Sequence, residues 1–215
     1  MPLNKSTLSE QIYHLLREDI LSQNIRCGEK LTLKLLMERF QVSSTPIREA
    51  LTRLSQDNLV TYYSNIGVNV ISLTASDLKE IYQFMGDLDG LAIRYSSSYP
   101  DRQLVIRTVE TGLARAREAL TSGLPKDWCR YSDQFHLDFY EFCRNSHLTE
   151  SAGRMRSQLT IFSNQYGREP AIQADIQDQH ETIFEAYRDG RIEDAVHLMK
   201  EHLEASLTHA LTLLS

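Results

Sequence analysis

Two short helical patterns separated by only four residues constrain this chain more than any other feature. The first pattern covers residues 33–40 and follows Thr32, a good helix-capping residue. Residues 41–44 are too few to be anything but a turn. Pro46 suits the first position of the next helix, and Glu49 falls in its first turn, where the helix dipole favours a carboxylate. The segment therefore predicts helix, tight turn, helix.

The second of these helices has one apolar and one polar face. Its apolar residues recur at helical spacing, at Ile47, Ala50, Leu51 and Leu54. The other face carries Thr45, Arg48 and Thr52, with Arg53 at its flank. A helix with a polar outer face that follows a tight turn is the arrangement of a helix-turn-helix.

The flanking sequence completes a winged helix-turn-helix. Residues 8–22 form a first amphipathic helix, and a break at 24–30 contains Gly28. Residues 59–63 and 68–73 are rich in β-branched and aromatic residues and flank the turn sequence 64–67, which predicts a two-stranded hairpin, the wing.

From residue 74 onward the periodicity is helical throughout. Helices are expected near 76–98, 102–121, 128–145, 148–166, 172–189 and 192–214. The fold class is therefore mainly α, with an N-terminal winged helix-turn-helix of three helices and a β-hairpin, and a C-terminal antiparallel all-α bundle. The domains are expected at 1–72, for DNA binding, and at 73–215, for effector binding and dimerisation.

Charge and cysteine content restrict the partners. Net charge is −6, but residues 1–72 carry 8 basic and 7 acidic side chains, whereas 73–215 carry 15 and 22. The acidity thus lies in the second part, which leaves the first free to approach DNA. No secretory signal or long apolar run is present, and the three cysteines are scattered, as in a reducing compartment. These features predict a cytoplasmic protein without a membrane partner.

The polar face of the second helix is suited to reading DNA. An arginine near the start of such a helix can contact guanine in the major groove, and this position is held by Arg48. Flanking phosphate contacts are expected from Lys34, Thr45 and Arg53, with Ser44 in the same turn. Gly67, which has no side chain, would let the hairpin tip approach the DNA closely.

The string from Val42 to Leu51, VSSTPIREAL, followed by Arg53-Leu54 and Asn58-Leu59-Val60, closely resembles the winged-helix domain of GntR-type bacterial regulators. The helical remainder resembles that of the FadR-like subgroup. Two basic residues of the family pattern are replaced, by Ser44 after the Val-Ser pair and by Ile66 before the wing glycine. The resemblance therefore implies that recognition depends heavily on Arg48 and Lys34, or that the operator differs.

The resemblance also implies a divalent metal in the bundle. Members of the subgroup hold it with an Asp, a His four residues later, and two further His on later helices. The matching positions here are Ser132, His136, His180 and His202, so the histidines are complete and the Asp is replaced. The adjacent Asp133, a water or the effector would complete the coordination of a Zn²⁺ or Ni²⁺ ion. Four other histidines match no ligand position: His14, His147, His197 and His209.

The effector pocket cannot be located from the sequence. The helix that usually supplies an effector-contacting Arg has none before Arg94. Seven aromatic residues could line a pocket or simply form the core: Tyr82, Phe84, Tyr131, Phe135, Phe139, Tyr140 and Phe162.

These features favour a ligand-responsive transcriptional regulator, a repressor, that binds double-stranded operator DNA as a homodimer. Its effector would be a small molecule, an organic acid, and the operator would be pseudo-palindromic. The alternatives are a metal-dependent enzyme that uses the three histidines and a helical protein-interaction module. The chain lacks a nucleophile motif or HExxH, and neither alternative explains the winged helix.

Overall fold

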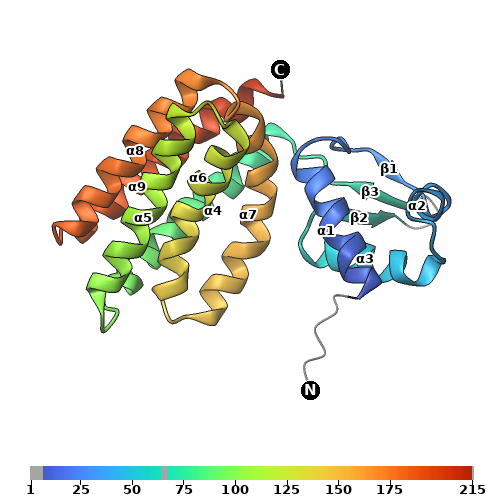
Figure 1. Ribbon diagram of the computed structural model, residues 1–215, viewed down its shortest axis with the longest axis horizontal. Coiled ribbons are helices and arrows are strands. Elements are labelled where there is room, and N and C mark those ends of the chain that lie inside the picture. The colour runs from blue at the N-terminus through green and yellow to red at the C-terminus, as the bar shows by residue number, and fades with distance from the viewer. Residues whose placement is uncertain (1–6, 64–66, 215) are drawn as a thin grey trace. The chain divides into compact units, whose positions relative to one another are not determined.

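The computed structural model of the protein describes residues 7–63 and 67–214 (Figure 1). The chain divides into two compact units, and the division falls between Leu73 and Thr74, one residue beyond the boundary expected from the sequence. Within the described ranges, none of the helices combines the length and the apolar character needed to cross a membrane.

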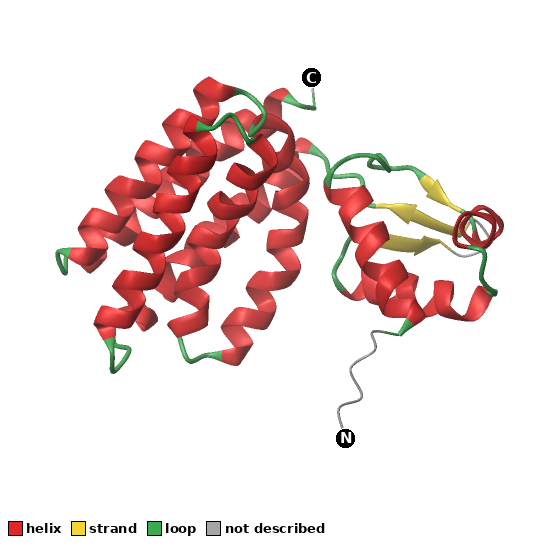
Figure 2. Cartoon of the chain, in the orientation of Figure 1, coloured by secondary structure: helices red, strands yellow, loops and turns green. Residues whose placement is uncertain are grey.

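The first unit is a winged helix-turn-helix, as predicted. It contains α1 (Leu8–Leu21), α2 (Leu33–Phe40) and α3 (Ser44–Gln56), together with the short strands β1 (Lys30–Leu31), β2 (Val60–Tyr63) and β3 (Gly67–Val70) (Figure 2). The stripe expected on α3 is confirmed, because its four apolar residues are at most 1% exposed. They pack against α1, whose Ile12 and Leu16 are equally buried.

The start of α3 differs from the expectation. The helix begins at Ser44 after the N-cap Ser43, so Pro46 is its third residue rather than its first. Proline is tolerated there because the first four N–H groups of a helix have no intrahelical partner to lose. The turn between α2 and α3 is made by Gln41, which takes the left-handed conformation with φ of 54°.

The sheet has one strand more than the expected hairpin. Its order is β1-β3-β2, both pairs antiparallel, with Tyr63 opposite Gly67 and Lys30 opposite Asn69. A two-residue strand is too short to show an alternating pattern, so periodicity does not predict β1. The tip of the hairpin, residues 64–66, lies outside the described residues.

The second unit is the predicted helical bundle. Its helices are α4 (Ala75–Ser97), α5 (Arg102–Thr121), α6 (Pro125–Phe142), α7 (Ser146–Tyr166), α8 (Pro170–Arg188) and α9 (Ile192–Thr212). The expected start of α6 is three residues late, because Pro125 initiates the helix. Its expected end, at 145, is also late, since Arg144 takes a positive φ of 53°.

Helix α4 is central to this unit, because it packs against α9, α6 and α7. A helix covered on several sides has little room for charge. Asp89 nevertheless lies in its middle and is 2% exposed, so its charge must be satisfied inside the bundle. The groups that satisfy it mark the candidate site.

Candidate metal centre and DNA-contact surface

The polar face of α3 is open, as a DNA-reading helix requires. Arg48 and Thr45 are exposed, and among the described residues no carboxylate lies within ion-pair distance of Arg48. Ser44 is half-buried at the start of the helix, and Lys34 is exposed in the first turn of α2. Arg48 and Gly67 border one open groove of ≈ 430 Å³, which the other predicted contacts do not line.

Arg53 is engaged within the unit. Its guanidinium lies 3.6 Å from the carboxylate of Glu10 and 4.2 Å from the ring centroid of Tyr13, both on α1. These contacts tie α3 to α1. Arg53 would have to leave them to reach a phosphate, so its part in the unbound protein is structural.

The three histidines expected from the family resemblance meet in the bundle. His136 is on α6, His180 on α8 and His202 on α9, and each is at most 6% exposed. One ring nitrogen of each lies within 4.8 Å of those of the other two. Chain segments up to 66 residues apart thus present three imidazoles to one point.

Neighbouring side chains orient two of the rings. His136 Nδ1 lies 2.8 Å from an Asp89 carboxylate oxygen, and His202 Nδ1 lies 2.7 Å from Oε1 of Gln179. Because both partners accept, each Nδ1 carries the proton and each Nε2 keeps its lone pair. An outer acceptor of this kind is the usual support of a metal-binding histidine.

The ring of His180 is held differently. It stacks on Phe135 at 4.2 Å between centroids, and its buried Nδ1 has no hydrogen-bond partner among the described groups. Burial, followed by the neighbouring imidazoles, lowers the pKa of both His180 and His202 well below the usual value. The rings are therefore neutral, which is the form that binds a metal.

The spacing of one pair of ring nitrogens matches that of two ligands of a metal ion. His180 Nε2 and His202 Nε2 are 3.2 Å apart. Two ligands of a tetrahedral zinc ion, with bonds of about 2.0–2.1 Å, are separated by about 3.3 Å. Imidazole nitrogens suit Zn²⁺ and Ni²⁺, so the three residues present fit the ion that the family resemblance implies, with positions left for a further ligand.

The expected replacement for the missing aspartate is not directed at the histidines. Asp133 Oδ1 instead lies 3.3 Å from Nη1 of Arg156, and in the part of the chain that the structure describes no carboxylate belongs to the histidine cluster. Ser132 and Asp133 both line the cavity beside His136 and His202. A carboxylate ligand for an ion here would therefore have to come from a shift of Asp133 or from a bound molecule.

Arg156 on α7 was missed by the sequence reasoning. It is 6% exposed, and its Nη2 donates to both oxygens of Asp89 at 2.8 and 2.6 Å. Asp89 also accepts from the hydroxyl of Tyr140 at 2.6 Å, so one carboxylate joins α4, α6 and α7. Burial alone would raise the pKa of Asp89, but Arg156 and His136 outweigh it and hold that pKa far below its usual range.

A signal for this network existed in the sequence. Asp89 follows Tyr82 and Met85 at helical spacing, and Arg156 lies between Ala152 and Leu159 on the buried stripe of α7. A charge on an apolar stripe must find a buried partner. The identity of that partner could not be read from the spacing.

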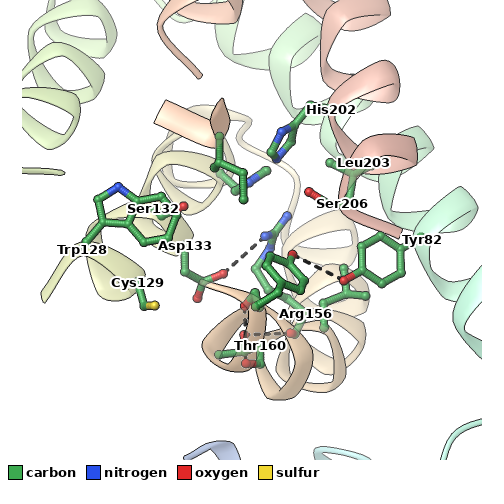
Figure 3. A pocket seen from close by; sticks show the side chains of 15 residues that line it. Tyr82, Trp128, Cys129, Ser132, Asp133, Arg156, Thr160, His202, Leu203 and Ser206 are labelled. Atoms are coloured by element: carbon green, nitrogen blue, oxygen red, sulfur yellow. Dashed lines mark hydrogen bonds and ion pairs between the residues drawn. The ribbon is translucent and has the colours of Figure 1, made fainter. Parts of the chain in front are cut away.

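The cavity beside the histidines is small and polar. Its volume is ≈ 40 Å³, enough for an ion with one or two water molecules or for the head of a small anion. Figure 3 shows Arg156 pointing toward His202, with a dashed line to Asp133. Nε of Arg156 is buried and has no partner among the described groups. Hydroxyl groups also line the cavity: Tyr82, Ser132, Thr160, Ser163, Tyr166 and Ser206.

Most of the aromatic candidates belong to the core. Phe135, Phe139, Tyr140 and Phe162 are buried, Tyr131 is half-buried and Phe84 is 48% exposed. Of the seven, Tyr82 alone lines the histidine cavity. The four remaining histidines lie outside the cluster.

Family models match both units. Residues 8–70 match the model described as bacterial regulatory proteins, gntR family, and residues 80–205, more than half of the chain, match the FCD domain. An uncharacterized HTH-type transcriptional regulator of Bacillus subtilis (strain 168), YdhC, is 28% identical over 93% of this chain and 87% of its own. The HTH-type transcriptional repressor GlaR of Escherichia coli (strain K12) is 24% identical over 89% and 90%.

A solved structure shares the fold. The structure titled E. coli McbR/YncC superposes with a TM-score of 0.79 at 19% identity and covers 98% of this chain and 100% of its own. At this identity the likeness establishes the architecture alone. The family models and relatives are those of transcriptional regulators rather than enzymes.

Proposed function

The chain belongs to the GntR family of bacterial regulatory proteins with an FCD domain, and from that premise we propose that it is a metabolite-responsive repressor. DNA-binding transcriptional regulation follows from the family. The proposal adds that the bundle binds a small organic acid through a divalent metal on His136, His180 and His202. The alternative of a three-histidine enzyme is set aside, because the relatives and families are regulators.

One observation carries the metal proposal: three buried imidazoles have ligand atoms within 4.8 Å of one another, and the Nδ1 atoms of His136 and His202 are held by acceptors. Core histidines without a ligand have no need of this convergence. A metal held by three protein nitrogens keeps open positions, and a carboxylate is a suitable occupant.

The charge of the cavity supports an anionic effector. The guanidinium of Arg156 is fixed by Asp89 and Asp133, and its Nε remains available for a bond to an oxygen atom. The metal and Arg156 would thus bind one anion from two sides. Because the cavity is ≈ 40 Å³, it admits a carboxylate head, and a larger body would require the helices around it to move.

The remaining parts of the proposal concern the DNA-bound state. A helix-turn-helix protein binds two half-sites as a two-fold dimer, so we propose a homodimer on a pseudo-palindromic operator. GlaR is named a repressor, which supports the proposal that this chain also represses transcription. Lys34, Ser44, Thr45 and Arg48 would contact the operator, with Gly67 at the wing. Bacterial DNA lies in the cytoplasm, where we place the protein.

The test is a binding titration against the DNA immediately upstream of the chain's own gene, monitored by fluorescence anisotropy. The protein is prepared without metal, with Zn²⁺ or Ni²⁺, and with metal plus a panel of mono-, di- and tricarboxylates. If the bundle is the sensor, metal with the matching carboxylate weakens operator binding about 5- to 150-fold, the usual range of allosteric coupling.

A matched pair of variants on α9 identifies the site. His202→Ala should abolish the response, whereas His197→Ala, exposed on the same helix, should retain it. If neither metal nor any carboxylate changes the operator affinity of the wild-type protein, the sensing proposal is overturned. A response that survives His202→Ala would overturn the assigned site. Derepression of a reporter on adding the same carboxylate distinguishes a repressor from an activator.

A further inference from the structure

The groove between α3 and the wing carries a positive charge that the predicted contacts do not include. Its lining contains two cations, Arg48 and Lys30, and no acidic side chain, although the whole chain has a net charge of −6. We infer that Lys30 and Tyr63 form a DNA-backbone contact at the wing and supply the charge that Ile66 does not. This inference rests on the DNA-binding function of the family.

The register of the sheet places the two side chains together. Lys30 lies opposite Asn69, and Gly67, two residues along β3, is on the same face of the sheet. Tyr63 is opposite Gly67 on the other neighbouring strand. Lys30 and Tyr63 therefore flank Gly67, one from each side.

Gly67 provides the space for the lysine. Cε of Lys30 lies 3.5 Å from the position that a Cβ of residue 67 would occupy. The φ of Gly67 is +116°, which L side chains rarely adopt. A bare backbone at this point leaves room for the stem of Lys30 beside Gly67.

Both groups are free to meet a phosphate. Lys30 is exposed, and no described carboxylate lies within ion-pair distance of it. The carboxylate of the adjacent Glu29 is engaged elsewhere, because it accepts from the backbone N–H of Arg26 at 3.0 Å. Tyr63 is 49% exposed, and its phenol can donate to a phosphate oxygen.

The contact of Lys30 with the DNA backbone would complement the base contacts of Arg48. Arg48 reads base edges from α3, whereas Lys30 approaches the sugar-phosphate strand from the wing side of the same groove. A lysine on a phosphate contributes affinity to any sequence and releases about one counterion. Lys30 thus sets affinity and register, and Arg48 sets sequence preference.

The test measures the salt dependence of binding. Wild type, Lys30→Gln, Lys30→Arg and Tyr63→Phe are titrated with the duplex from upstream of the chain's own gene, and with a scrambled duplex of the same length and composition, over a series of KCl concentrations. Lys79→Gln, exposed on α4 in the other unit, is the control for net charge. Thermal unfolding confirms that each variant is folded.

Lys30→Gln should flatten the slope of log K against log [KCl] by about 0.9, and weaken both duplexes by the same factor. Lys30→Arg should restore the slope, Tyr63→Phe should weaken binding with the slope unchanged, and Lys79→Gln should match wild type. A Lys30→Gln slope equal to that of wild type, or a loss confined to the specific duplex, would overturn the contact. Absence of salt-dependent binding by wild type would overturn the DNA-binding function itself.

Discussion

The ion pair between Asp89 and Arg156 is the most heavily buried pair of charges in the described bundle. A buried charge without its partner costs about 3–5 kcal/mol, so neither residue can be replaced alone without a large loss of stability. The network also holds His136 in the tautomer that presents Nε2 to the cavity. Stability and the orientation of a proposed metal ligand therefore depend on the same side chains.

Asp138 on α6 is a buried carboxyl group without a cationic partner among the described residues. It is 3% exposed, and it accepts a hydrogen bond from the side-chain amide of Gln134 at 2.8 Å. Burial, assisted by the charge of Glu141, raises its pKa to about 6. Since the folded protein holds this proton more tightly than the unfolded chain does, ionised Asp138 destabilises the fold above pH 6, and the penalty disappears as the pH falls below about 4.

Asp138→Asn should therefore raise the Tm at pH 7.5, and raise it much less at pH 4.5. The amide keeps the size of the side chain and can still accept from Gln134. Circular dichroism melts at the two pH values measure the difference. Glu150→Gln, exposed on α7, is the control and should leave the Tm almost unchanged. Equal gains for Asp138→Asn at both pH values would show that its carboxyl is not strained by burial.

At the scale of the element, the residues of α3 that stabilise the fold and those predicted to contact DNA lie on different faces of the helix. Its apolar stripe is fully buried, whereas Thr45, Arg48 and Thr52 on its outer face are exposed. A substitution on the outer face can therefore change DNA binding without unfolding the helix. Arg53 is the exception, because it also binds α1.

Arg48→Ala should remove the preference for the operator while the Tm stays at the wild-type value. The loss expected for one arginine that reads a guanine is about 1–3 kcal/mol of discrimination. Competition between the operator duplex and a scrambled duplex measures it. Gln56→Ala, exposed near the end of the same helix, should keep the preference. Unchanged discrimination by Arg48→Ala would remove Arg48 from the reading of bases.

At the scale of the molecule, the chain combines two units with separate cores and different chemistry. The first carries an open basic groove, and the second carries buried imidazoles and most of the acidity. A metal that binds the second unit should stabilise that unit through mass action.

Zn²⁺ or Ni²⁺ at 100 times its Kd should stabilise the protein by about 2.7 kcal/mol and raise the Tm, and EDTA should reverse the effect. His180→Ala should abolish the shift, whereas His147→Ala, outside the cluster, should preserve it. Differential scanning calorimetry measures the shift, and native mass spectrometry reports the bound metal and the mass of the assembly. A Tm indifferent to metal and chelator in wild type would refute the metal site.

The sequence alone determined the winged helix-turn-helix and the helical bundle. Both follow from local signals: the tight turn before α3, the cap at Thr32 and the stripe of α3, whose period is set by the helix itself. The family resemblance supplied the three histidines. Their convergence required the fold, because α6, α8 and α9 bring them to one point.

Only the tertiary structure decided the partners of the buried and exposed charges. Asp89 and Arg156 are 67 residues apart, and no local period relates them. Asp133 contacts Arg156 rather than the histidines. Lys30 lies beside Gly67 because the two-residue strand β1 pairs with β3. Periodicity reports which face a residue occupies within its own helix or strand. Which charge it meets depends on how distant elements pack, and that is set by the whole fold.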